Sequence, residues 1–90
     1  MLQIPSPPSG LELAIAHGLR SLCVAVMTDL LGDAEVALRT GLPQQAIDSL
    51  LWHQRWTVST GLRVAEMLRI PDAAVASVVI AAVRTQEDAP

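Results

Sequence analysis

The amino-acid sequence predicts an all-α fold of five helices. Apolar residues make up 51% of the chain, yet it holds no Phe or Tyr and only two Trp. A core made of Leu, Val, Ile, Ala and Met suits the packing of helix on helix. Apolar residues recur at steps of three and four, the period of a helix, and Gly and Pro separate these stretches. At 90 residues the chain is expected to form one compact domain.

The first helix is expected to follow a flexible N-terminal arm, residues 1–9, which is rich in Pro and Ser. Ser9 and Glu12 fit a capping box, so the helix is predicted to span about residues 10–31. Gly18 costs a helix about 1 kcal/mol relative to Ala, which predicts a bend or break there. The apolar stripe that would face the core comprises Leu11, Ile15, Leu19, Leu22, Val26 and Leu30.

The second and third helices are predicted around a tight turn. Asp33 is a suitable N-cap for a second helix over Ala34–Thr40. Gly41 is expected to end this helix in the left-handed conformation, because glycine carries no Cβ atom. Pro43 has its φ angle preset for a helix start, so the third helix is expected over Pro43–Trp52. Its inward side chains would be Ala46, Ile47, Leu50 and Leu51.

The last two helices are predicted to follow a loop over His53–Val58. The fourth is expected over Ser59–Arg69, and its buried side chains would be Leu62, Ala65 and Leu68. The fifth, over Ala73–Arg84, is apolar on nearly every side, and a polar tail over residues 85–90 follows. Such a helix cannot bury all of its faces in so small a domain, which predicts a covering partner. The helical domain is therefore expected to span residues 10–84.

The overall charge counts against DNA binding, whereas the local charge permits it. The chain has six Arg, no Lys and nine acids, a net charge of −3, and phosphate contact rewards basic surfaces. Residues 39–69, however, hold four Arg and two acids. The middle of the chain is therefore mildly basic.

Several classes of function are not expected. The sequence shows no glycine-rich phosphate loop, no His–carboxylate pair at ligand spacing and no activated nucleophile, which predicts no enzyme, cofactor or metal site. The single Cys23 cannot form a disulfide within the chain and fits a buried thiol in a reducing cytosol. No secretory signal is visible, and the stretches Leu11–Val26 and Ala73–Val83 are interrupted or too short to cross a bilayer. A cytoplasmic protein without a membrane partner is expected.

The spacing of Ala37, Gly41 and Ile47 predicts how the second and third helices meet. A small residue, a turn glycine and a β-branched residue let two helices cross closely at a steep angle, which frees the later one to enter a DNA major groove. Residues 32–70 resemble the helix-turn-helix of the Cro and lambdoid phage repressor family, a motif also found in many bacterial regulators. The matching residues are Val36, Ala37, Thr40, Gly41, Leu42, Ile47, Leu50, Arg55, Leu62, Val64, Ala65, Leu68 and Ile70. The resemblance implies a five-helix, lambda-repressor-like domain with an extended first helix that binds double-stranded DNA as a homodimer.

The resemblance places Gln44 and Gln45 at the N-terminal end of the third helix, which is the end that points into the major groove. A glutamine amide can donate to N7 of adenine and accept from its N6 amine, a bidentate contact worth about 1–3 kcal/mol of discrimination. Ser49, one turn further on the same face, is the third expected base contact. Phosphate contacts are expected near the start of the second helix, at the turn and after the third helix, from Asp33, Arg39, Thr40, Gln54 and Arg55. The alternative is that these are ordinary solvated positions.

The fifth helix is the expected dimer contact, through Val75, Val78, Val79, Ala82 and Val83. Alternatively, these side chains complete a tight single-chain core. The predicted function is a small, sequence-specific transcriptional regulator, of the phage Cro or immunity-repressor type, in a bacterial or phage-infected cell. The alternative, which the acidic balance and the apolar helices favour, is a non-catalytic protein-interaction module such as an antitoxin, an antirepressor or a regulator subunit.

Overall fold

The computed structural model describes residues 10–88, so the expected N-terminal arm and the Ser9 cap lie outside the described residues. Within that range the chain is all-α, with five helices and no strand, which confirms the predicted class. The helices are α1 (Gly10–Ala25), α2 (Asp33–Thr40), α3 (Gln44–Asp48), α4 (Val58–Met67) and α5 (Asp72–Asp88). A π-helical turn, Val26–Leu31, extends α1, and a second one, Ser49–His53, extends α3.

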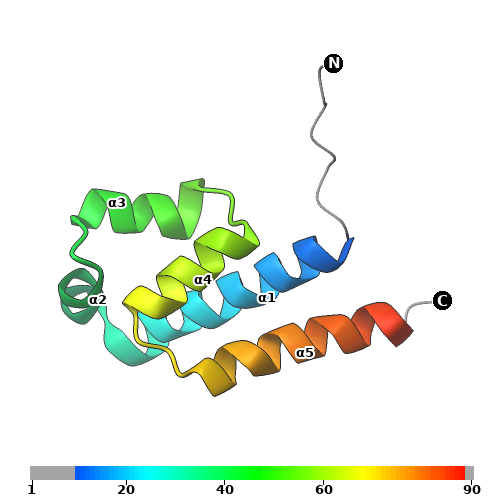
Figure 1. Cartoon of the computed structure of the whole chain (residues 1–90). Coiled ribbons are helices and arrows are strands. Elements are labelled where there is room, and N and C mark those ends of the chain that lie inside the picture. The colour runs from blue at the N-terminus through cyan, green and yellow to red at the C-terminus, as the bar shows by residue number, and fades with distance from the viewer. Residues whose placement is uncertain (1–9, 89–90) are drawn as a thin grey trace, which may run out of the picture.

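The central helix is α1, and both α4 and α5 pack against it (Figure 1). Two glycines set these contacts. A Cβ atom added at Gly18 would lie 2.7 Å from Cγ1 of Val78 on α5, and one added at Gly61 on α4 would lie 2.6 Å from Cβ of Leu19. Because no side chain stands between them, the helices approach closely at both places. The break predicted at Gly18 is wrong, since α1 stays helical through it and packs on Val78.

The hydrophobic core lies among α1, α2, α3 and α4. Leu19, Cys23 and Leu68 have no exposed surface. Ile47, on the inner side of the third helix, is 1% exposed. The other core members are Met27, Val36, Leu50, Leu51, Trp56, Val64 and Ala65. Burial raises the pKa of the Cys23 thiol to about 11, so this side chain serves as a neutral packing group. The predicted burial of Cys23, Ile47, Leu50 and Leu51 is confirmed.

The inward face of α4 differs from the prediction by one residue. Leu62, predicted to be buried, is 46% exposed. The inward positions are Gly61, Val64, Ala65 and Leu68, which follow the steps of three and four expected of a helix face. Gly61 occupies the place that touches α1, so Leu62 must point away from it. The Thr57 hydroxyl caps this helix by accepting a hydrogen bond from the Thr60 amide at 3.1 Å.

The connections around the third helix follow the predicted turn chemistry with two changes. Gly41 has φ 68° and donates its N–H to the Ala37 carbonyl at 2.9 Å, which confirms the left-handed end of α2. The N-cap of α2 is Gly32 rather than Asp33, because Gly32 takes a positive φ of 79° that ends the preceding turn and redirects the chain. The third helix extends through His53, and the Gln54 amide closes its last turn on the Ser49 carbonyl at 2.7 Å.

The last helix, α5, packs one side on α1 and leaves the other side open. It runs to Asp88, four residues beyond the predicted end at Arg84, so part of the expected polar tail is helical. Of the expected dimer residues, Ala82 is buried within its own subunit, whereas Val75, Val78, Val79 and Val83 are half-buried. A dimer contact through the four valines would use the part of each side chain that α1 leaves exposed.

The rod formed by α1 and its π-helical turn is also the one described helix, Gly10–Leu31, that is long and apolar enough to cross a bilayer by length and composition. This corrects the expectation that the stretch Leu11–Val26 is interrupted or too short, because the whole helix to Leu31, which was predicted over about residues 10–31, is long and apolar enough. A core helix of a bundle passes the same test. Of the apolar span in Gly10–Leu31, 22% is buried, and its buried residues include Leu19, Cys23 and Met27, each at most 2% exposed.

We predict that Gly61→Ala destabilises the protein. The added methyl group would overlap Leu19, so α4 must shift away from α1, at a cost of about 1–3 kcal/mol in the free energy of unfolding. Urea denaturation followed by circular dichroism measures this loss. Gly10→Ala is the control, because its nearest contact would lie at an ordinary 3.4 Å. Equal stability of the Gly61→Ala variant and the parent would contradict the close-packing account.

Candidate nucleic-acid interface

The third helix lies along one edge of the molecule, with its inner side on the core and its outer side uncovered (Figure 1). Ile47 and Leu50 hold the inner side in place. Gln44, Gln45 and Ser49 are all exposed on the outer part of the helix. The structure therefore presents the three expected base-contact residues to solvent, as contact with a base edge requires.

An acidic residue that was not among the expected contacts shares this surface. Nε2 of Gln44 donates a hydrogen bond to Oδ1 of Asp48 at 2.9 Å, one turn further along the helix, and both side chains are exposed. The spacing of four residues is the sequence signal that could have revealed this pair. The pair fixes the direction of the Gln44 amide, while the Asp48 carboxylate can accept a hydrogen bond from the amine of cytosine and repels phosphate.

Two of the expected phosphate contacts are engaged inside the subunit. Arg39 forms a salt bridge from Nε to Oε1 of Glu35 at 2.9 Å and donates from Nη1 to the Leu68 carbonyl at 2.7 Å. The Thr40 hydroxyl donates to the Val36 carbonyl at 2.8 Å and accepts from the Leu42 amide at 3.2 Å. Arg39 thereby ties α2 to the end of α4. A phosphate could bind Arg39 only in exchange for these contacts.

The other three expected phosphate contacts, Asp33, Gln54 and Arg55, are exposed. Asp33 is the first residue of α2, where the free backbone amides of a helix start favour an anion but the Asp33 carboxylate itself does not. Arg55 lies between the third and fourth helices. Its neighbour Trp56 is buried and donates from Nε1 to the Leu50 carbonyl at 2.7 Å, which fixes the chain next to Arg55.

A second exposed arginine, Arg63 on α4, was not predicted as a contact. It lines a groove of about 440 Å³ between the third helix and α4, together with Ser49 and Gln54. No local sequence pattern indicates this position, because it depends on how α4 packs beside the third helix. The positive charge that faces outward here comes from Arg55 and Arg63 rather than from Arg39.

Comparisons of this chain with protein-family models, with curated proteins and with solved structures give no match. The described residues contain no group of three or more His, Cys, Asp or Glu side chains placed to hold a metal ion. The assignment of function therefore depends on the geometry of the third helix and its surroundings.

We predict that Arg39→Ala lowers the stability of the free protein. The change removes the charged hydrogen bond to the Leu68 carbonyl and the salt bridge to Glu35, which together contribute about 1–2 kcal/mol. Thermal unfolding without DNA measures the loss. Arg84→Ala, at an exposed position of α5, is the control and should leave the melting temperature unchanged. An unaltered melting temperature for Arg39→Ala would contradict a stabilising role for these contacts and would leave Arg39 available to bind phosphate.

Proposed function

We propose that this chain is a small, sequence-specific DNA-binding transcriptional regulator of the Cro and lambdoid repressor type, with a helix-turn-helix formed by α2 and the third helix. The observation that carries the proposal is the third helix itself. Ile47 and Leu50 lie in the core beneath it, while Gln44 and Gln45 project into solvent directly after the left-handed Gly41 turn. A rigidly seated helix with an amide-bearing outer tip is suited to the major groove.

In this proposal the third helix reads bases and two arginines hold the backbone. Gln45 is free to form a bidentate contact with adenine, and the Gln44–Asp48 pair offers a donor–acceptor edge to a neighbouring base. Arg55 and Arg63 contact phosphates on either side of the helix. With two such cations per subunit, the logarithm of the affinity should fall with the logarithm of salt concentration at a slope of roughly −4 for a dimer.

The protein would bind as a homodimer whose third helices enter successive major grooves about 34 Å apart. Support for a dimer comes from α5, where the apolar residues on the side away from α1 are exposed, including Ile80 at 51%. The half-buried Val75, Val78, Val79 and Val83 flank that side. The burial of Leu19, Cys23 and Met27 supports a role for α1 as a core helix, in keeping with a cytoplasmic regulator in a bacterial or phage-infected cell.

Selection of duplexes from a random pool tests the proposal and identifies the operator at once. Enrichment of a two-fold symmetric sequence, bound more weakly as salt rises, supports a dimeric regulator. No duplex binding even at low salt would overturn it. That result would favour the non-catalytic interaction module, which the exposed Leu30 and Leu38, at 76% and 77%, also suit.

We predict that the double variant Gln44→Ala, Gln45→Ala loses specific DNA binding without losing stability. Each glutamine contact supplies about 1–3 kcal/mol of discrimination, so affinity for the selected duplex should fall by roughly tenfold or more. Fluorescence anisotropy measures the affinity and thermal unfolding measures the stability. Gln86→Ala, an exposed glutamine on α5, is the matched control. Undiminished specific affinity in the double variant would disprove this assignment of the base-reading face.

We predict a different effect for Arg63→Gln, which removes a phosphate contact. Binding should weaken to a similar extent on specific and unrelated duplexes, and the salt slope of a dimer should become shallower by about 2. Titrations at several salt concentrations provide both quantities. Arg84→Gln carries the same change in charge far along α5 and should leave the slope unaltered. A salt slope equal to that of the parent would show that Arg63 makes no phosphate contact.

A further inference from the structure

A groove runs between the N-terminal half of α1 and the segment that follows the third helix; we refer to it as the α1 groove. It consists of two adjoining hollows of about 410 Å³ and 620 Å³. Leu13, Ala16, Arg55 and Trp56 line both hollows, so the two are neighbours along these side chains. Its size is that of a site for a ligand or for a few side chains of a partner.

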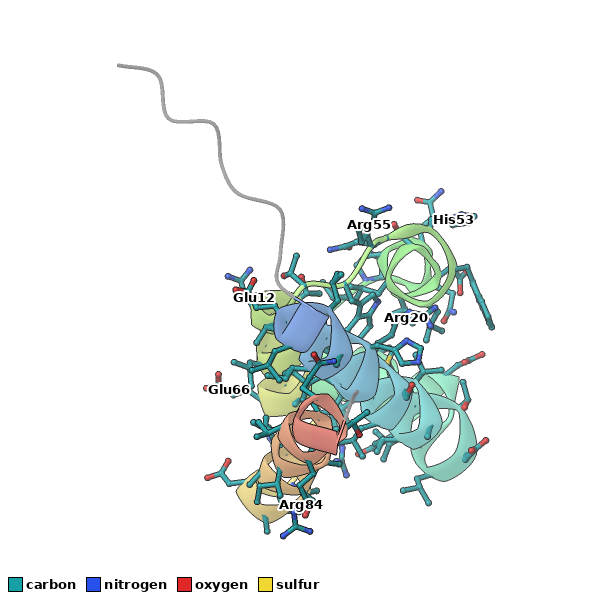
Figure 2. All side chains as sticks on the ribbon, turned by 90° about the vertical axis from the view of Figure 1, so that its right-hand side faces the viewer. Glu12, Arg20, His53, Arg55, Glu66 and Arg84 are labelled. Atoms are coloured by element: carbon teal, nitrogen blue, oxygen red, sulfur yellow. The ribbon has the colours of Figure 1, made fainter. Side chains whose placement is uncertain are left out.

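One half of the α1 groove gathers cationic and aromatic side chains. Both histidines of the chain, His17 and His53, line it with Arg20 and Arg55, and among the described residues it has no acid in its walls. Figure 2 shows Arg20, His53 and Arg55 on the same side of the molecule, with Arg84 at the opposite side. In a chain with a net charge of −3, a hollow without acids is a local positive region that attracts carboxylates.

The other half is largely apolar. Ile15 and Val58 are half-buried there, and Leu13 is 56% exposed. The Trp56 indole forms part of the wall and is held by its hydrogen bond to the Leu50 carbonyl. Apolar surface of this kind beside a charged hollow can receive an aliphatic or aromatic side chain.

The walls are fixed before any ligand binds. Nη2 of Arg20 donates to the Leu51 carbonyl at 2.7 Å, which joins α1 to the third helix, and its remaining N–H groups can still donate. Trp52 stands at the rim with 68% of its surface exposed, an unusual position for so large a side chain. Trp and Arg are the residue types that most often dominate binding at protein interfaces.

We propose that the α1 groove binds an acidic, amphipathic peptide segment of another protein. An apolar side chain of the segment occupies the half lined by Ile15 and Val58, and neighbouring carboxylates contact the cationic half, which Arg20 and Arg55 line. The chain's own residues 1–9 contain no acid and lack this complementarity. The proposal does not depend on DNA binding by the third helix.

The chemistry of the α1 groove favours a peptide over a single-stranded nucleic acid. Nucleic-acid strands need a continuous basic track with open aromatic faces. Here Trp52 is exposed at the rim, but Trp56 is only 7% exposed, and the apolar half is lined by Leu13, Ile15 and Val58. These features accommodate an aliphatic anchor and interrupt the basic track that a nucleic-acid strand needs.

The test uses the full chain and two synthetic peptides without aromatic residues. One carries a Leu–Leu pair flanked by several Glu residues, and the other has Gln in place of every Glu. Because both Trp residues line the α1 groove, binding should change their fluorescence saturably. The Glu peptide should bind roughly tenfold or more tightly than the Gln peptide, since charged hydrogen bonds are lost in the exchange.

Substitutions at two exposed positions that line both hollows test the charged and the apolar contacts of the α1 groove without disturbing the core. Arg55→Gln and Leu13→Ser should each weaken binding of the Glu peptide several-fold at an unchanged melting temperature. Arg84→Gln, on α5 and far from the groove in Figure 2, is the charge-matched control and should bind as the parent does. The proposal would be overturned if Arg84→Gln weakened binding of the Glu peptide as much as the groove variants do, or if neither groove variant weakened it.

Two competitors complete the test. A Glu peptide that lacks the Leu–Leu pair should bind several-fold more weakly than the parent peptide, and equal binding would overturn the proposal in favour of a simple anion site. A short oligothymidine should fail to displace the bound peptide. Displacement of the peptide by the oligothymidine would overturn the proposal in favour of a single-stranded nucleic acid as the ligand.

Discussion

The contact between Leu19 and the bare backbone of Gly61 is the constraint on which the rest of the structure depends. Leu19 has no exposed surface, and the space beside it admits no Cβ atom at residue 61. One turn further along α1, the Cys23 thiol donates a hydrogen bond to the Gly61 carbonyl, with 3.8 Å between the sulfur and the oxygen. This close approach joins α1 and α4 into a floor on which Ile47, Leu50 and Leu51 lie. The outer face of the third helix is presented to solvent because its inner face is held by that floor.

Long side chains with strong donors tie the ends of the helices together. Arg39 binds the Leu68 carbonyl at the end of α4, while Arg20 and Trp56 bind the Leu51 and Leu50 carbonyls in the last turn of the third helix. Carbonyls in the last turn of a helix lack partners within it, so such donors stabilise both the helix and its packing. The chain has six Arg and no Lys. Some of these arginine side chains thus stabilise the fold, and only the others remain to bind a ligand.

This division explains why two proposed surfaces meet at one short segment. Arg55 is exposed beside the third helix and also lines the α1 groove, and buried Trp56 holds it there. A partner in the α1 groove and a duplex on the third helix would both draw on Arg55. Occupation of one surface by an acidic ligand would therefore weaken the attraction of the other for phosphate, through competition for one charge rather than through a change of shape.

Sequence periodicity and turn chemistry determined the five helices, most of the core and the Gly41 turn, because these follow from local preferences of the backbone and from the need to bury one face of each helix. The tertiary structure alone decided the exposure of Leu62, the helical state of Gly18 and the internal role of Arg39. In each case the deciding partner lies far along the chain. Leu62 is exposed because its neighbour Gly61 packs on Leu19, Gly18 packs on Val78, and Arg39 binds the Leu68 carbonyl. The same holds for Arg63 and for the α1 groove, which exist only because packed helices bring distant residues together. A local pattern encodes which face turns inward, but which side chains meet there is settled by how the helices fit against one another.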